Sequence, residues 1–269
     1  MNDNCYICFV NLAKAEMVNM KDVFEHIERK VYKHTFLQQV DVNLEYPIIK
    51  KDELTSAFVG LADLFFRNHF HAELNEIPLS EKSIFFKDDD QQLAFRFTPI
   101  ASMLSVGYKN YNTFYDSVLP HLYPLKEYVF NVLGRDEVRT CLRKVNVFSV
   151  EKHTELDQEK QDRIFLQNVI SSAFLNTEAS KSEVIIEGEN TEVSVRKFQI
   201  DGFALELRTY FLHKKEGLSS LFLDSIVSYD ADVSNVEDLL KKANDILFDV
   251  YHWSVSEGII GIMNNDSEV

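Results

Sequence analysis

The sequence predicts an α+β protein in which a largely antiparallel, curved sheet is covered by helices. Segments with strand periodicity come in runs, at 83–108 and again at 183–229, and do not alternate singly with helices. Such clustering favours an antiparallel sheet over a parallel doubly wound fold. Long segments with an apolar stripe at helical spacing are typical of helices that cover one face of a sheet.

The order of helices and strands divides the chain into three parts. Residues 1–35 form an N-terminal extension that carries a short helix at 21–32. Residues 36–150 and 151–269 form two α+β halves that pack as one unit. Each half reads as a helix, several strands in a meander and a final helix, so we expect the halves to be structurally similar. Only 8 Gly and 5 Pro occur in the chain, which argues against long flexible linkers.

The first half opens with a strand at 36–46, where apolar and polar residues alternate up to Pro47. An amphipathic helix is expected from Asp52, which can cap its N-terminus, to Phe70. The elements that follow are strands at 83–87, 93–98 and 103–108, a helix from 110 that Pro120 ends or kinks, a helical piece at 125–133 and a strand at 139–148.

The second half begins with a long helix at 157–174 and closes with an amphipathic helix at 236–253. Gly258 marks a break before a short C-terminal piece. The strands between the two helices are expected at 183–187, 192–200, 204–212 and 221–229.

The charge balance limits the class of partner. Lys and Arg number 28 against 43 Asp and Glu, which gives a formal net charge of −15. A field of this sign repels the nucleic-acid backbone, so it disfavours nucleic acid and favours a cationic or Arg-bearing protein partner. The sequence has three cysteines and no secretory pattern, which indicates a reduced, cytoplasmic protein. It has no apolar run long enough to cross a membrane, so we expect no membrane contact.

Residues 139–148 carry the most specific signal in the chain. They read as a strand, and alternation along a strand places Arg139 and Arg143 on the same face. The two guanidinium groups must be neutralised, because an unpaired buried charge is costly. They either hold an anionic ligand or a partner's carboxylate, or pair within the chain, for example with Asp224 or Glu206.

Two weaker patterns have ordinary explanations that we prefer. Cys5 and Cys8 form a Cys-x-x-Cys pair at the N-terminus, without the further ligands that zinc needs. His69, His71 and Glu73 could bind a metal, but histidines are common at helix ends, where they meet the helix dipole favourably. We therefore expect no metal site.

A metal-dependent nuclease is a further alternative by loose analogy, but the spacing fits no nuclease pattern and acidic hairpin ends are usually solvated. The residues concerned are Glu206, Lys214, Lys215, Asp224, Asp230 and Asp232. Gly-x-Ser-x-Gly, P-loop and Gly-x-Gly-x-x-Gly spacings do not occur, so we expect no cofactor and no catalytic set. The candidate ligand- or partner-binding residues are Arg139, Arg143, Asn146 and Asp224, with Asn146 satisfying backbone groups at the end of its strand.

The same strand resembles the most recognisable segment of a sporadically distributed, uncharacterised bacterial family, which reads approximately Arg-Ile-Gly-Leu-Arg-Tyr-Ile-Asn. Cys141 stands where the family favours Gly, and Lys144 where it favours Tyr. Weaker similarities at 36–46, 103–114 and Leu223–Asp224 extend the resemblance over most of residues 36–263. The matching or conservatively matching residues of the strand are Arg139, Leu142, Arg143, Val145 and Asn146. The resemblance implies a shared α+β fold and an accessory role, such as a defence or mobile-element function.

Two functional hypotheses follow. The favoured one is a non-enzymatic protein that binds a protein partner or itself through its sheet surface and acidic exterior. The alternative is an enzyme or sensor that grips an anionic ligand, a nucleotide or a nucleic-acid phosphate, through Arg139 and Arg143.

Overall fold

The structure, a computed structural model, describes most of the chain. The described residues are 18–19, 27–28, 30–67, 73–74, 84–88, 92–110, 112–150, 157–176, 180–185, 192–213 and 219–264. The Cys5–Cys8 pair, His69, His71 and Lys214–Lys215 lie outside these ranges.

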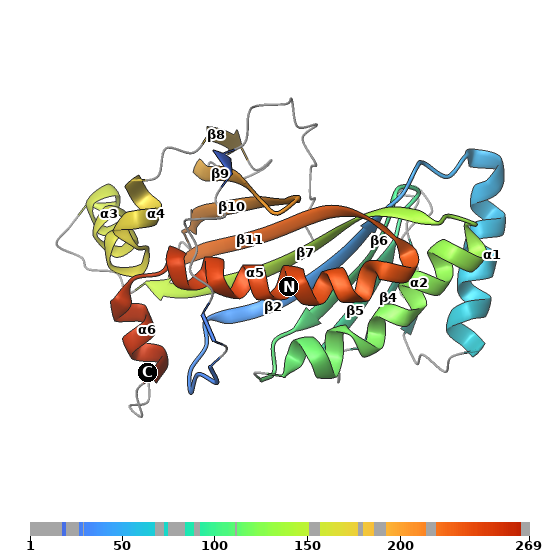
Figure 1. Cartoon of the computed structure of the whole chain (residues 1–269), viewed down its shortest axis with the longest axis horizontal. Helices are drawn as coiled ribbons and strands as arrows, with labels where there is room; N and C mark the ends of the chain where they lie inside the picture. The colour runs from blue at the N-terminus through green and yellow to red at the C-terminus, as the bar shows by residue number, and fades with distance from the viewer. Residues whose placement is uncertain are drawn as a thin grey trace.

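One twisted sheet forms the centre of the molecule (Figure 1). The described part of the sheet has the strand order β1-β9-β10-β11-β7-β2-β6-β5-β4-β3, with β8 paired to β9. Its strands are β1 (Val18–Asn19), β2 (Leu37–Glu45), β3 (Glu73–Leu74), β4 (Ile84–Asp88), β5 (Leu93–Phe97), β6 (Ala101–Gly107), β7 (Glu137–Val150), β8 (Ser180–Ile185), β9 (Glu192–Ile200), β10 (Phe203–Leu212) and β11 (Ser219–Asp232). Every described pairing is antiparallel except β1 with β9, which confirms the α+β prediction.

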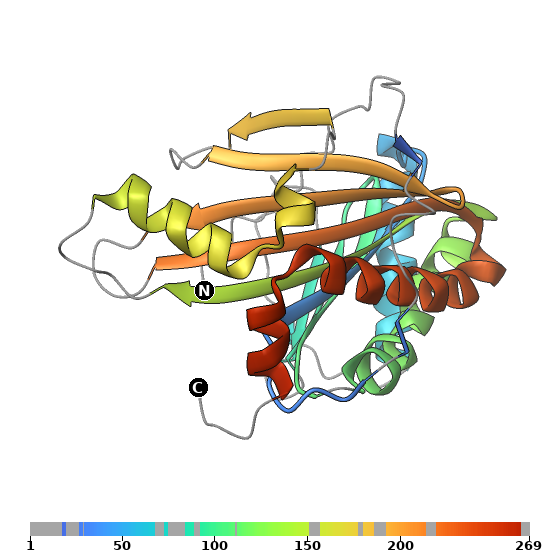
Figure 2. The ribbon, with the colours of Figure 1, turned by 60° about the vertical axis from the view of Figure 1, so that its left-hand side comes forward.

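The helices α5, α2 and η2 pack against one face of this sheet, with α5 lying across its middle (Figures 1 and 2). The helical elements are α1 (Lys51–Arg67), η2 (Phe114–Val118), η3 (Pro120–Leu122), α2 (Tyr123–Glu127), η4 (Tyr128–Val132), α3 (Gln158–Val169), α4 (Ser172–Asn176), η5 (Val233–Asn235), α5 (Val236–Ser254) and α6 (Glu257–Asn264). Helix α1 packs against α2 and η4, and α3 packs against α6. The α5 stripe Val236, Leu240, Leu247 and Val250 is fully buried, because it covers apolar residues of β7 and β11. This helix-facing side of the sheet holds the hydrophobic core.

The two long strands β7 and β11 join the first and second halves of the chain. They pair from Glu137–Asp232 to Val150–Ser219, so strands from both halves belong to one sheet. On the other side of β7 lies β2, which places the opening strand of the first half next to the centre. The structural similarity of the two halves stays a prediction.

The N-terminal helix expected at 21–32 is not present in its described part, since residues 27, 28 and 30–32 are not helical. This segment instead lies against α5: the Ile27 N–H donates to Asp249 Oδ1 at 3.1 Å. The hydroxyl of Tyr32 forms a hydrogen bond with Nε2 of His252. Contact with α5 therefore replaces the local hydrogen bonds of a helix.

The N-terminus of α1 also differs from the expectation. Asp52 lies in the first turn of α1 and is not the cap, because the Lys50 carbonyl already accepts the N–H of Leu54 at 3.0 Å. The carboxylates of Asp52 and Glu53 there still interact favourably with the helix dipole.

Pro120 marks a change of helix type without a gap in the helical segment, since η2 ends at Val118 and η3 begins at Pro120. The Leu119 N–H donates to the Phe114 carbonyl, a π-type turn, and Pro120 then begins a 3₁₀ turn at a position where no N–H is needed. Helical structure therefore continues from η2 through η3 and α2 to η4.

Two helix breaks in the second half coincide in space. The expected helix 157–174 divides after Val169, and the C-terminal break falls at Val255, before Gly258, which lies inside α6. Ile170 and Val255 form an antiparallel bridge, and the Ser256 N–H donates to the Val169 carbonyl at 2.8 Å. Each break satisfies the backbone groups that the other leaves open.

No helix in the described ranges is both long enough and apolar enough to cross a membrane. The cytoplasmic location stays a prediction.

Candidate functional site

Strand alternation along β7 is as expected. Thr140, Leu142 and Phe148 face the helices and are almost completely buried. Arg139 and Arg143 face the opposite side of the sheet, where no described helix packs. On that face, the register sets Arg143 beside Asp41 of β2, and Arg139 beside Glu45 of β2 and Asp230 of β11.

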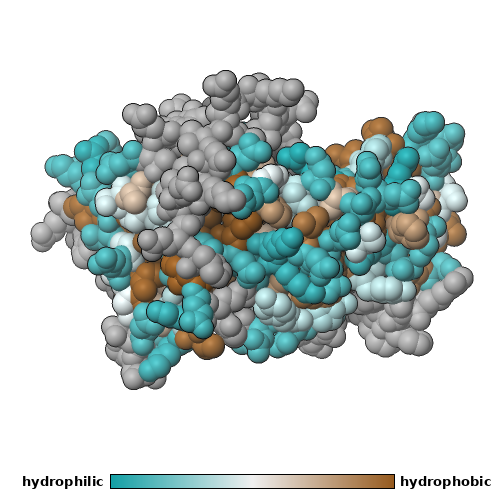
Figure 3. Space-filling model, in the orientation of Figure 1, coloured by the Kyte–Doolittle hydropathy of each residue, from teal (hydrophilic) through white to brown (hydrophobic). Residues whose placement is uncertain are grey.

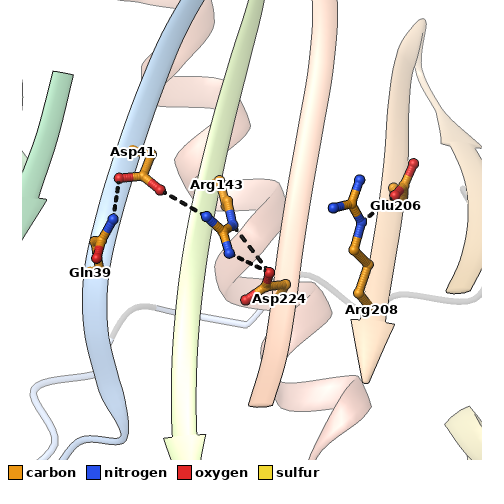
Figure 4. Close-up of polar contacts among 6 residues, drawn as sticks. All are labelled: Gln39, Asp41, Arg143, Glu206, Arg208 and Asp224. Carbon is orange, nitrogen blue, oxygen red and sulfur yellow. Dashed lines mark hydrogen bonds and ion pairs between the residues drawn. The ribbon is translucent and has the colours of Figure 1, made fainter. Parts of the chain in front are cut away.

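The inner row, Asp41–Arg143–Asp224, crosses three neighbouring strands (Figure 4). Arg143 donates from Nη1 to Asp41 Oδ2 at 3.2 Å, and from Nε and Nη2 to Asp224 Oδ2 at 3.2 and 2.5 Å. The Gln39 amide donates to the other oxygen of Asp41 at 2.7 Å. All three charged residues are buried, with exposed fractions of 3% for Asp41, 8% for Arg143 and 2% for Asp224.

Burial dominates the electrostatics of Asp224 in the inner row. It raises the pKa of the Asp224 carboxyl above its ordinary value, although the neighbouring Arg143 acts to lower that pKa. Oδ1 of Asp224 is buried without a hydrogen-bond partner. An anionic ligand at Arg143 would have to displace one of two carboxylates from the guanidinium group. The inner row therefore acts as a cross-link between β2, β7 and β11.

The outer row, Glu45–Arg139–Asp230, lies on the same three strands nearer the end of the sheet. It is open to solvent: the Arg139 side chain is 38% exposed and that of Asp230 is 85% exposed, with 3.9 Å between Arg139 Nη1 and Asp230 Oδ1. Nη2 of Arg139 donates to the Ser228 hydroxyl at 3.0 Å. Desolvation raises the pKa of Glu45, an effect that Arg139 partly offsets.

A cavity of about 370 Å³ opens at the outer row. We call it the acidic cavity, because Glu45, Glu137 and Asp230 line it together with the single cation Arg139. The remaining lining comes from Tyr46, Pro47 and Val138. Three carboxylates against one guanidinium group leave an excess of negative charge, so the cavity suits a cationic group.

Cys141 lies between the two rows on β7. Burial raises the pKa of its thiol to about 12. The thiol therefore stays protonated near neutral pH and is a poor nucleophile.

Glu206 does not pair with the arginines of β7, which corrects one expected partner. It accepts a hydrogen bond from Arg208 Nε at 2.5 Å on its own strand (Figure 4). Lys197 Nζ of β9 lies 3.8 Å from Glu206 Oε2. The strand order explains the difference, because β11 separates β10 from β7.

Asn146 is separated from the other candidate residues. It faces the helices, is 4% exposed, and lines a second cavity beneath α5 instead of the strand end, since β7 continues to Val150. Lys144, Ser225 and Asn244 line the same cavity, and sequence reasoning did not single them out. The available signal was a pair of polar residues, Lys144 and Asn146, on the apolar side of the strand.

Among the described residues, no group of three or more His, Cys, Asp or Glu side chains is arranged to hold a metal ion. Asp230 and Asp232 are exposed at the end of β11, away from the buried Asp224. The acidic residues considered for a nuclease site therefore do not form one cluster in this part of the chain.

Neither the known protein-family models nor the curated proteins include a match to this chain. The resemblance to the bacterial family with the Arg-Ile-Gly-Leu-Arg-Tyr-Ile-Asn segment stays a prediction.

Proposed function

We propose that this chain is a non-enzymatic binding protein whose acidic cavity receives a lysine or arginine side chain of a protein partner. The observation that carries this proposal is the excess of carboxylates in the cavity: Glu45, Glu137 and Asp230 surround one cation, Arg139. Glu137 and Asp230 are exposed, so a partner's cation can reach them without moving the backbone. Charge complementarity of this kind steers association and selects the partner.

Exposed apolar residues beside the acidic cavity support a protein as the source of that cation. Ile48 follows the lining residue Pro47, and the Ile100 carbonyl accepts the N–H of Tyr46 at 3.0 Å. The two isoleucines are 67% and 54% exposed. Apolar contact beside a charged anchor is typical of a protein interface and gives a free small cation no advantage.

The alternative function, anion binding through Arg139 and Arg143, is less well supported. The inner-row carboxylates already bind Arg143. Arg139 lies among three carboxylates, which repel an anion at that position. Self-association would bring two copies with a net charge of −15 together, so a cationic partner fits better than a second copy.

The experiment compares binding of two fluorescent peptides to the full chain. Both peptides contain leucine, and one carries arginines where the other carries glutamates. We expect the arginine peptide to bind, with an affinity that falls as salt is raised. Asp230→Lys should abolish its binding, and Glu257→Gln, an exposed residue on α6, should leave binding unchanged.

Equal binding of the two peptides, or full binding by Asp230→Lys, would contradict the proposal. A concentration-dependent dimer that Asp230→Lys disrupts would replace the cationic partner with a second copy of the chain. Light scattering of the pure protein separates that outcome from peptide binding.

A further inference from the structure

The second cavity lies on the other face of the sheet, beneath α5, and has a volume of about 100 Å³. Lys144 of β7 and Ser225 of β11 are cross-strand neighbours in its floor, and Asn244 of α5 lies above them. The segment before β2 closes one side, where the Lys33 N–H donates to the carbonyl of Met263 at 3.0 Å. We call this space the α5 cavity.

Several buried polar side chains line the α5 cavity. Asn244 and Ser225 are 2% and 1% exposed, and neither Asn244 Nδ2 nor Ser225 Oγ has a hydrogen-bond partner. Lys144 Nζ makes a long contact of 3.4 Å with the Asn244 carbonyl. Buried polar atoms are normally hydrogen-bonded, since desolvation without a partner costs free energy. Asn244 Nδ2 and Ser225 Oγ are therefore arranged for a hydrogen-bonding group that enters the cavity.

The charge of the lining selects the kind of group. Lys30 and Lys144 both line the α5 cavity, and no carboxylate occurs among its described lining residues. This is unusual in a chain with 43 acidic and 28 basic residues. Lys144 supplies an ammonium group, Asn244 an amide N–H and Ser225 a hydroxyl, and all three can donate to a carboxylate.

The remaining walls set the size and polarity of the rest of the ligand. Leu37, Phe114, Leu247, Phe248 and Met263 give the α5 cavity an apolar lining. A protein cavity of about 150 Å³ can hold benzene, so the α5 cavity, about two-thirds as large, suits a whole ligand of roughly four carbon atoms or fewer. Around the cavity the outer face of α5 is mainly hydrophilic, with smaller hydrophobic patches between the elements (Figure 3).

We propose that the α5 cavity binds a small organic monocarboxylate, with its carboxylate at Lys144, Asn244 and Ser225 and its apolar body against α5. Asn146, which lines the same cavity, is a further neighbour for the bound carboxylate. This site is independent of the acidic cavity, because the two lie on opposite faces of the sheet. A small acid in this position would connect segment 30–37, the sheet and α5.

The test uses isothermal titration of the full chain with propionate, butyrate, 1-butanol and inorganic phosphate. We expect propionate or butyrate to bind about tenfold more tightly than 1-butanol, because only the acids carry the charge that Lys144 attracts. Phosphate should not bind, since it has no apolar body. Ser225→Ala, which removes one donor with little change of volume, should weaken acid binding roughly threefold.

Lys144→Met should weaken acid binding by about tenfold or more, and Lys242→Met, on the exposed face of α5, should leave it unchanged. The proposal is wrong if neither acid binds at concentrations up to about 10 mM. It is also wrong if 1-butanol binds as tightly as butyrate, or if folded Lys144→Met binds like the wild type. The comparison of acid with alcohol needs only the wild-type chain, so the test stands even where Lys144→Met fails to fold.

Discussion

Asp41 and Asp224 bind one guanidinium group, that of Arg143, from opposite sides. The two carboxylates come from β2 and β11, which are far apart in the sequence and are separated in the sheet only by β7. The inner row thus ties together the three strands at which the two halves of the chain meet. Four residues earlier on β7, Arg139 lies between Glu45 and Asp230 at a solvated site. An arginine between two carboxylates therefore forms a buried cross-link in the inner row and part of a solvent-exposed acidic surface in the outer row.

Arg143→Met should destabilise the protein strongly. The variant leaves Asp41 and Asp224 buried on opposite sides of an uncharged side chain, and loss of one partner from a buried ion pair costs about 3–5 kcal/mol. The matched variant Arg139→Met, at an exposed pair, should change the free energy of unfolding by about 1 kcal/mol or less. Urea unfolding followed by circular dichroism measures both. Similar losses for the two variants would mean that the inner row is not a special cross-link.

Asp224 should make stability depend on pH in a predictable direction. Its pKa is raised in the folded state, so the folded protein holds this proton more tightly than the unfolded chain does. The stabilising contribution is complete below the unfolded pKa of about 3.9 and is lost as pH rises through the raised folded pKa. Asp224→Asn lacks this titration. We therefore expect the free energy of unfolding of the wild type to rise, relative to that of Asp224→Asn, as the pH is lowered from 7 towards 4. The difference between the two proteins should grow over this range. A difference that shrinks over this range would show that pairing with Arg143 outweighs burial.

Glu45 should make binding of the arginine peptide depend on pH. Burial raises the pKa of Glu45, so the acidic cavity loses one negative charge earlier during acidification than ordinary glutamates would allow. Affinity of the wild type should fall as the pH drops through this raised pKa, and Glu45→Gln should bind more weakly at neutral pH with a flatter profile. Fluorescence anisotropy between pH 7 and 4 measures both profiles. Parallel profiles for the two proteins would place the titrating group elsewhere.

Two glycines should respond in opposite ways to alanine. Gly134 follows η4 with a φ of 61°, a conformation that alanine adopts only with strain, although no atom lies within 4 Å of the added methyl group. Gly134→Ala should cost about 1 kcal/mol. Gly261 lies inside α6 with equally open surroundings, so Gly261→Ala should stabilise by about 0.5–1 kcal/mol. Thermal unfolding that shifts in the same direction for both variants would contradict the role given to the backbone at Gly134.

Local patterns in the sequence were enough to determine the fold class and most strands. Alternation along residues 139–148 put Arg139 and Arg143 on one face, because side-chain direction in a strand depends only on the backbone of that strand. The apolar stripe of α5 likewise predicted a buried face, since helical spacing is a local property. The need to neutralise Arg143 also followed from the sequence, because the cost of burying a charge does not depend on which residue pairs with it.

The tertiary structure alone decided which groups do the pairing. Asp41 joins Asp224 at Arg143, and Glu206 does not, because β2 and β11 flank β7 and β10 lies one strand further away. The helix breaks at Ile170 and Val255 arise from a bridge between segments that share no local pattern. Ser225 lies beside Lys144 because of the strand register, and Asn244 lies in the same cavity because of where α5 packs on the sheet. Strand order, register and helix docking are long-range properties that depend on how the whole core packs, so no single stretch of the chain encodes them.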